Sequence, residues 1–308
     1  GVVAAPELVD GRYRPVGQLG RGASATVYLA EDMKLGERVA LKIFRGLEGR
    51  VGQELLLGRR VSHPNVCRVF DAGVADGASY LTMEHVRGRT LSEVLAEHEG
   101  APLPDADSVV RQLLAGLGAA HDAGIVHRDL KPQNVLVEDG TGRVVITDFG
   151  LALSTSGSVA RTAVEPSSLT RSGELPGTPL YMAPEQLGGG EVDPRADQFG
   201  FCASLYEALH GTRPFGGRTL EELRANIEAQ RFQLGASASR VPPRVERAVR
   251  RGLSARKDDR FPSMAALLAE LEPPRSRALL FTAAAAVPLV VGLALVGWWR
   301  SAVPRCPP

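Results

Sequence analysis

Eight residues near the middle of the chain, 127–134, bring a carboxylate, a lysine and an amide close together. They read His-Arg-Asp-Leu-Lys-Pro-Gln-Asn, and an Asp-Phe-Gly triplet follows at 148–150. Phosphoryl transfer needs a carboxylate that orients the attacking hydroxyl and oxygen donors that hold Mg²⁺ against the phosphates. Asp129, Asn134 and Asp148 supply these groups, so we expect them to converge in one site.

Two segments nearer the N-terminus could hold the phosphates themselves. Residues 19–27 read Leu-Gly-Arg-Gly-Ala-Ser-Ala-Thr-Val, and the two glycines let backbone N–H groups approach phosphates without side-chain collision. Taken alone, such a turn is equally compatible with an ordinary hairpin. Lys42 ends the apolar run Val-Ala-Leu, and Glu54 follows twelve residues later, where it could pair with the lysine. A lone lysine could instead extend along an apolar edge, but the combination favours a nucleotide site.

The elements that must position these groups change in type along the chain. A helix is expected at 50–61, and short strands separated by turn residues are expected at 13–19, 25–32, 38–44, 66–71 and 79–85. Beyond Thr90 helical patterns dominate, at 91–98, 106–123, 195–211, 219–230, 243–253 and 262–271. We therefore predict an α+β fold with two lobes, a small β-rich lobe with one helix and a larger helical lobe, with a cleft between them.

Composition limits the class of protein and its partners. The chain has 308 residues, of which 44% are hydrophobic and 23% charged, with a formal net charge of +1. This suits a globular enzyme and gives no field that favours nucleic acid, so no nucleic-acid partner is expected. The three cysteines lack metal-ligand spacing and are expected to be reduced thiols. Residues 154–179 are rich in Ser, Thr, Gly and Pro and are expected to form a functional loop.

A second change in composition begins after the helical region. Residues 272–278 form a polar linker, and the 21 residues 279–299 contain no charge. As a helix at about 1.5 Å per residue they would span roughly 31 Å, close to the hydrocarbon core of a bilayer. Trp298, Trp299 and Arg300 at one end suit the interface. A buried core helix is the alternative, but we predict a single transmembrane helix at 279–299, followed by a tail at 300–308 that is short or belongs to a larger outer domain.

The polar segments, in this order, resemble the signature set of the protein kinase family, which ends with the Ala-Pro-Glu triplet found here at 183–185. The similarity runs over 13–271, which implies an N-terminal extension at 1–12, an N-lobe at about 13–86 and a C-lobe at about 87–271. Residues 177–186, Gly-Thr-Pro-Leu-Tyr-Met-Ala-Pro-Glu-Gln, resemble the bacterial, eukaryotic-like serine/threonine kinases. Many of these carry a membrane helix after the kinase domain.

The resemblance implies roles for the chemical groups. Lys42 would contact the α- and β-phosphates of ATP and pair with Glu54. Asp129 would orient the substrate hydroxyl, and Lys131 would neutralise charge on the γ-phosphate. Asn134 and Asp148 would ligate Mg²⁺, with Mn²⁺ as the alternative ion. The backbone carbonyl of Glu84 and the N–H of Val86 would bind adenine, and the residues implied around ATP are Leu19, Gly20, Gly22, Val27, Ala40, Lys42, Glu84, Val86 and Leu136.

Other positions are implied to support or regulate the site. Asp197 would brace the catalytic loop, and Arg260 would pair with Glu185. Lys131 together with Thr178 indicates transfer to serine and threonine hydroxyls of proteins. Thr162 and Thr170 are the leading candidates for autophosphorylation, and Arg128 would bind the resulting phosphate. A loop that is merely soluble is the alternative for this region.

Two positions depart from the family pattern. Ala25 replaces the third glycine of the loop, which leaves the two glycines nearest the phosphates in place. Gly58 stands where relatives have a bulky apolar side chain, and its absence would leave a void beside Phe149. We therefore hypothesise that activity depends on homodimerisation or phosphorylation.

Three other functions compete with this interpretation. A catalytically silent pseudokinase on a membrane would lack at least one of the chemical groups, and a small-molecule kinase would lack the segment at 177–185. A Rossmann dinucleotide site is excluded because no parallel strand–helix–strand unit follows the glycines. Because Mg-ATP is cytosolic, the kinase domain of this single-pass membrane protein is expected to face the cytoplasm.

Overall fold

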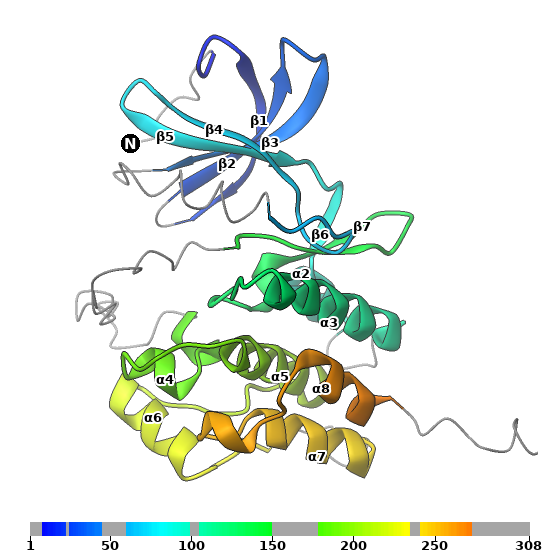
Figure 1. Ribbon diagram of the computed structural model, residues 1–308, viewed down its shortest axis with the longest axis vertical. Coiled ribbons are helices and arrows are strands. Elements are labelled where there is room, and N and C mark those ends of the chain that lie inside the picture. The colour runs from blue at the N-terminus through cyan, green and yellow to red at the C-terminus, as the bar shows by residue number, and fades with distance from the viewer. Residues whose placement is uncertain are drawn as a thin grey trace, which may run out of the picture. The chain divides into compact units, whose positions relative to one another are not determined.

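The computed structural model describes residues 8–22, 25–44, 60–98, 105–149, 178–234 and 241–272. The chain divides into two compact units, 1–271 and 272–308, and every described helix and strand lies in the first (Figure 1).

The N-terminal part of the first unit is a five-stranded antiparallel sheet in the order β1-β2-β3-β5-β4. Its strands are β1 (Tyr13–Arg21), β2 (Ala25–Asp32), β3 (Glu37–Phe44), β4 (Val69–Ala75) and β5 (Ala78–Glu84). Successive side chains of a strand point to opposite faces. Accordingly, Val39 and Leu41 pack with Tyr13 and Tyr80 on one face, whereas Ala40 and Phe44 pack in a different cluster on the other. Lys42 lies two positions from both Ala40 and Phe44, so its side chain points to the same face of the sheet as theirs.

A smaller sheet lies between the five-stranded sheet and the helices (Figure 1). It consists of β6 (Gly88–Thr90), β7 (Val135–Glu138) and β8 (Val144–Ile146), in that order. Helix α2 (Leu91–Glu97) starts directly after β6, where the Thr90 hydroxyl accepts from the Glu93 N–H at 3.2 Å and the Glu93 carboxylate accepts from the Thr90 N–H at 2.8 Å. This capping box fixes the start of α2 at the end of the strand.

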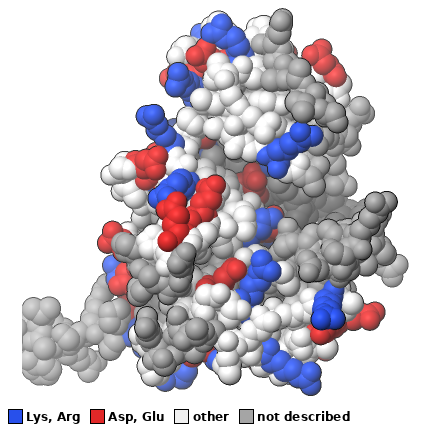
Figure 2. Space-filling view, turned by 180° about the vertical axis from the view of Figure 1, so that it is seen from behind, with Lys and Arg blue, Asp and Glu red and all other residues white. Residues whose placement is uncertain are grey.

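The C-terminal part is helical. Its helices are α3 (Ala106–Asp122), α4 (Pro184–Leu187), α5 (Arg195–His210), α6 (Leu220–Glu228), α7 (Pro243–Gly252) and α8 (Met264–Leu271). Helix α5 is buried over most of its circumference and forms the centre of this lobe, with Phe199, Cys202 and Tyr206 fully buried. Helix α7 packs on it closely, because a Cβ at Gly252 would lie 2.2 Å from the Cys202 sulfur. Acidic and basic side chains lie interspersed over the face seen in Figure 2.

The predicted two-lobed α+β architecture is confirmed. The six helices predicted beyond Thr90 lie within two residues of those observed. The strand predicted at 66–71 was placed too early: Val66 forms an isolated bridge with Ile146, and β4 begins at Val69. The small sheet β6-β7-β8 was not predicted, because its strands are only three or four residues long and β8 is entirely buried, so it shows no alternation.

Two of the predicted elements lie outside the described residues, namely the apolar segment at 279–299 and the helix at 50–61, of which only residues 60 and 61 are described. None of the helices in the described ranges has the length and apolar composition that crossing a bilayer requires.

Candidate active site

Asp129 lies at the centre of the predicted catalytic loop. Lys131 Nζ donates to its Oδ2 at 2.7 Å. The side-chain amide of Asn134 donates both to the backbone carbonyl of Asp129 at 2.8 Å and to Oδ2 at 3.1 Å. The short 3₁₀ turn Pro132–Asn134 brings the amide back over the carboxylate, since the proline fixes its first residue. The three groups that the sequence places within six positions therefore meet around one carboxylate.

The fourth chemical group joins the two lobes. Lys42 Nζ on β3 lies 2.8 Å from Oδ1 of Asp148, 106 positions later in the chain. The lysine is 3% exposed and the aspartate 29% exposed. The segment carrying Asp148 is tied to the catalytic loop, because the Thr147 N–H donates to the Asn134 carbonyl at 2.9 Å. Lys42, Asp148 and the catalytic loop thus belong to one site between the sheet and the helices.

Two residues of this site have strained backbone. Arg128 has φ +66° and Asp148 has φ +61°, values that non-glycine residues rarely adopt. Such strain persists only where the surroundings over-determine the conformation, and it clusters at functional sites. His127 supplies one constraint, since its Nε2 donates to the Thr147 carbonyl at 2.8 Å and its ring packs edge-on against Phe149 at 4.7 Å.

Asp197, at the start of α5, supplies the other constraint. Its carboxylate accepts the backbone N–H of His127 at 2.8 Å and that of Arg128 at 2.7 Å, and it lies 2.8 Å from Nε2 of His121. The side chain is fully buried. A buried carboxylate with three donors fixes the backbone it binds. Asp197 therefore fixes the backbone of the catalytic loop at His127 and Arg128, where the resemblance implies a brace.

The segment at 183–186 anchors the other side of the loop. Arg260 bonds Glu185 with both terminal nitrogens, at 2.6 and 2.9 Å, and its side chain is fully buried. The neighbouring Gln186 donates to the Arg128 carbonyl at 2.6 Å. Gly200 allows close packing on the loop, since a Cβ there would lie 2.8 Å from the Leu130 carbonyl oxygen.

Sequence reasoning assigned no role to His121, His127, Gln186 or Gly200. His127 and Gln186 adjoin assigned motif residues, and Gly200 ends the Asp-Gln-Phe-Gly run at 197–200, so adjacency was a usable signal for all three. His121 lies outside every motif and offered none.

Arg128 is placed differently from the other charged groups. Its Nε is buried and finds no hydrogen-bond partner among the residues that the structure describes. Burial lowers the pKa of its guanidinium, and the charge of Asp197 partly offsets this. The loop that is expected to supply its partner lies outside the described ranges.

Apolar side chains suited to an adenine ring share one cluster. Ala40 and Val86 are buried in it, and Val27 and Leu136 pack against it. Met83 and Cys67 belong to the same cluster, and burial raises the pKa of the Cys67 thiol. Leu19 does not join it and is 50% exposed on β1. Gly20 pairs with Val27, and the Gly22 N–H donates to the Ala25 carbonyl at 2.8 Å, so both predicted glycines lie at the β1–β2 turn.

The donor set around the catalytic loop fits magnesium. Within the described ranges, no cluster of three His, Cys, Asp or Glu side chains is placed to hold a metal ion. Mg²⁺ is commonly held by one or two protein oxygens together with substrate phosphates. The carboxylate of Asp148 and the amide oxygen of Asn134 suit that requirement, since the Asn134 nitrogen is already used on Asp129.

Some predicted site residues lie outside the described part of the chain, namely Glu54, Gly58, Thr162 and Thr170. Thr178 begins the 3₁₀ turn Thr178–Tyr181, and its side chain is not described.

Comparison with known proteins agrees with this geometry. Serine/threonine-protein kinase PknL of Mycobacterium tuberculosis is 34% identical over 273 residues, which cover 86% of this chain and 66% of PknL. Serine/threonine-protein kinase PrkC of Bacillus subtilis is 32% identical over 249 residues, covering 78% of this chain and 36% of PrkC. The chain thus spans less than two thirds of the length of these relatives.

Two solved structures are similar in fold. The Mycobacterium tuberculosis PknI kinase domain matches 88% of this chain and 98% of its own, with a TM-score of 0.64 and 24% identity. A structure of Rad53 residues 1–466 in complex with AMP-PNP matches 85% of this chain and 66% of its own, with a TM-score of 0.68 and 26% identity. The protein kinase domain family matches residues 13–268. The resemblance seen in the motifs is therefore confirmed, and the chain belongs to the protein kinase family.

Proposed function

We propose that this protein transfers the γ-phosphoryl group of ATP to serine and threonine hydroxyls of proteins. The observation that carries this proposal is that Lys131 and Asn134 meet at the Asp129 carboxylate, while Lys42 pairs with Asp148 on a segment that Thr147 ties to the same loop. Each of these groups matches one requirement of phosphoryl transfer. The relatives PknL and PrkC are themselves named serine/threonine-protein kinases, which supports the substrate class.

The chain's own residues define the steps of the proposed reaction. Asp129 accepts the proton of the substrate hydroxyl, whose oxygen attacks the γ-phosphorus as the bond to the β-phosphate oxygen breaks and ADP leaves. Lys131, 2.7 Å from Asp129, lies where it can neutralise charge on the transferred group. Lys42 holds the remaining phosphates. Mg²⁺, when bound, supplies further charge neutralisation through Asn134 and Asp148.

Regulation by loop phosphorylation belongs to the same proposal. Arg128 carries a buried nitrogen with no partner in the described ranges, which suits a phosphate on Thr162 or Thr170. Homodimerisation remains a hypothesis that rests on Gly58 in the sequence.

We also propose that residues 279–299 cross a membrane, with the kinase domain in the cytoplasm and a role in membrane-linked signalling. The support is the uncharged sequence itself. Expression of the chain with and without residues 273–308 tests this: the longer form should stay with membranes after an alkaline wash, and equal release of both forms would contradict it.

The activity is tested by incubation of the protein with Mg-ATP and a generic basic protein. Replacement Asp129→Asn should lower kcat about 10³-fold, because the amide cannot accept the hydroxyl proton. Asp122→Asn is the matched control, since this aspartate at the end of α3 is exposed. Phosphate should appear on serine and threonine, and a chelator should abolish the transfer. An inactive parent protein would instead identify a pseudokinase.

A further inference from the structure

Arg143, the residue directly before β8, contacts three segments of the chain. Its terminal nitrogen Nη2 donates to Oε1 of Glu84 and, at 3.1 Å, to Oε1 of Glu138. Its Nε donates to Oε2 of Glu138 at 3.2 Å, and Nη1 donates to the Pro64 carbonyl at 3.2 Å. All three guanidinium nitrogens therefore donate hydrogen bonds, and the planar geometry of the group fixes the directions of these bonds.

The hairpin that carries Arg143 is shaped to present it. Gly140 and Gly142 have φ +76° and +66°, which the tight turn between β7 and β8 requires. The Thr141 hydroxyl donates to the Glu138 carboxylate at 2.7 Å and accepts the backbone N–H of Arg143 at 3.1 Å. Contacts within the hairpin thus hold Arg143 and Glu138 together, independently of Glu84.

Glu84 and Glu138 lead directly to the two surfaces expected to bind adenine. Glu84 ends β5, its N–H donates to the Arg68 carbonyl at 2.9 Å, and its own carbonyl is the expected acceptor for the base. Glu138 lies two positions after Leu136 on β7, so both side chains point to the same face of the strand. Leu136 packs in the apolar cluster that is expected to cover the ring.

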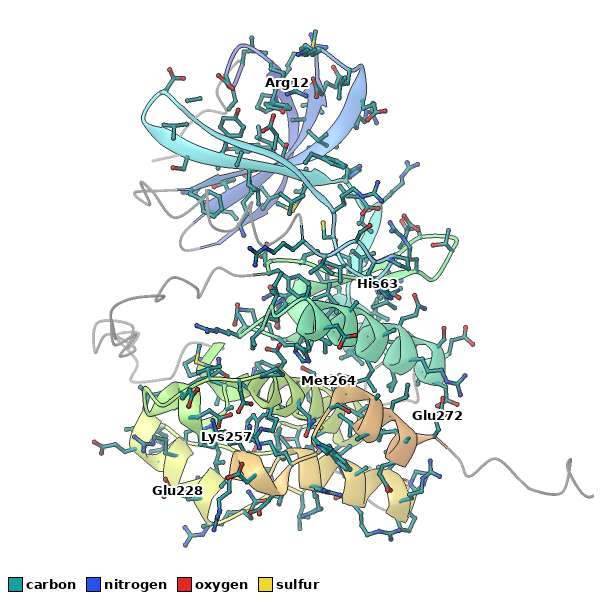
Figure 3. All side chains as sticks on the ribbon, viewed as in Figure 1. Arg12, His63, Glu228, Lys257, Met264 and Glu272 are labelled. Atoms are coloured by element: carbon teal, nitrogen blue, oxygen red, sulfur yellow. The ribbon has the colours of Figure 1, made fainter. Side chains whose placement is uncertain are left out.

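Residues 87 and 88 also lie close to β7. The Asp139 N–H donates to the Arg87 carbonyl at 2.9 Å, and Gly88 pairs with Glu138. A Cβ at Gly88 would lie 2.1 Å from the Val137 carbonyl oxygen, so no side chain fits between β6 and β7 there. Figure 3 places His63, the residue before Pro64, beside this small sheet.

We propose that Arg143 is a positioning residue for the adenine base of ATP, which acts through Glu84 and Glu138 and touches no nucleotide itself. It fixes the spacing between the backbone acceptor at the end of β5 and the apolar strand that carries Leu136. This inference rests on the proposed kinase function and adds the residue that sets base recognition. The partial burial of both partners supports a defined geometry, since the side chain of Arg143 is 28% exposed and that of Glu84 is 27% exposed.

The test compares ATP with purine riboside triphosphate, which lacks the 6-amino group and cannot donate to the Glu84 carbonyl. Equilibrium binding of each nucleotide is measured by calorimetry on the full chain, alongside KM and kcat for phosphate transfer. Arg143→Ala should raise the dissociation constant for ATP about fivefold, a size typical of a residue that acts through another. The constant for the purine analogue should change less than about twofold, and kcat should be retained, because the phosphate-binding groups are untouched.

Two further variants separate positioning from a general effect on folding. Arg89→Ala removes a more exposed ion pair, from Arg89 on β6 to Glu97 at 2.5 Å, and should leave the binding of both nucleotides unaffected. Arg143→Lys keeps the charge but not the fork, and should give a smaller loss of ATP affinity in the same direction. If Arg143→Ala does not fold, the lysine variant carries the comparison.

The possible results separate the positioning role of Arg143 from the proposed kinase function. A selective loss of ATP over the purine analogue supports the positioning role. Equal weakening of both nucleotides, or no weakening in either, overturns it while the kinase function stands. A parent protein that binds neither nucleotide overturns the proposed function and this inference together.

Discussion

Two arginines of the helical lobe, Arg260 and Arg128, are held in opposite ways. Arg260 makes a bidentate pair with Glu185, and its nitrogens also donate to backbone carbonyls, of Ser254 at 2.9 Å, Arg195 at 2.9 Å and Ala255 at 3.3 Å. Arg128 has a buried Nε with no partner in the described ranges, and its backbone is strained.

The difference fits the proposal that Arg260 stabilises the fold and that Arg128 binds a loop phosphate. A buried charge without partners costs free energy, so it persists only where something else compensates for it or where the function requires it. Arg260 is fully compensated within the described chain and locks the 183–186 segment to the lobe. Arg128 adjoins Asp129, is fixed by Asp197 and Gln186 through its backbone, and has a side chain that suits an anion.

The largest effect is expected from Arg260→Ala. The substitution leaves the buried Glu185 carboxylate unpaired and should lower the free energy of unfolding by about 3–5 kcal/mol. Chemical denaturation of the parent and the variant measures the difference. Arg256→Ala is the matched control, because Arg256 is 80% exposed and lies 4.0 Å from Asp259, and it should change stability little. Equal effects of the two substitutions would mean that burial does not distinguish these arginines.

A smaller, pH-dependent effect is expected at Asp193, which supports the same region. Burial raises the pKa of this carboxyl, but hydrogen bonds from Arg195 and Lys257 outweigh burial and leave the pKa well below its usual range. Folding thus favours the charged form, so the stabilisation is present above about pH 4 and is lost as the pH falls. Asp193→Asn should cost about 1 kcal/mol at pH 7.

The measurement is the free energy of unfolding of the parent and of Asp193→Asn as a function of pH. Their difference should shrink steadily below about pH 4, because the aspartate of the parent is then protonated in the unfolded chain. A difference that stays constant down to pH 3 would show that the substitution acts by packing and not by charge.

Much of the site followed from the sequence because its groups lie in short, dense motifs. Asp129, Lys131 and Asn134 are close in the chain and meet around one carboxylate. The pair between Lys42 and Asp148 was not predicted, since the resemblance implied Glu54 as the partner of Lys42. Helix α3 was predictable for a related reason, because it buries one stripe that includes Leu113, Leu117 and Ala120.

What could not be predicted depends on contacts between distant segments. The small sheet has no alternating pattern, since β8 is buried on all sides, and so it gave no strand signal. His121 meets Asp197 across 76 positions, and Arg143 meets Glu84 across 59, with no spacing rule that links them. Leu19 was expected near ATP; it is 50% exposed and lies at the register shift between Gln18 and Gly20 in the pairing of β1 with β2.

The smallest effect on stability is expected from Arg128→Ala. Removal of a guanidinium whose Nε is buried and unpaired forfeits no hydrogen bond at that atom, so the unphosphorylated protein should change by less than about 1 kcal/mol, in clear contrast to Arg260→Ala.

The informative measurement compares the free energy of unfolding before and after incubation with Mg-ATP. The parent should gain about 1 kcal/mol if a loop phosphate binds Arg128, because a charge-assisted hydrogen bond replaces an unmade one. Phosphate is supplied to the variant by the parent protein in trans, and mass spectrometry verifies equal occupancy. Under those conditions the variant should gain nothing. A gain of the same size in both proteins would place the phosphate elsewhere and leave the unpaired nitrogen of Arg128 without a functional explanation, which would remove the contrast between the two arginines.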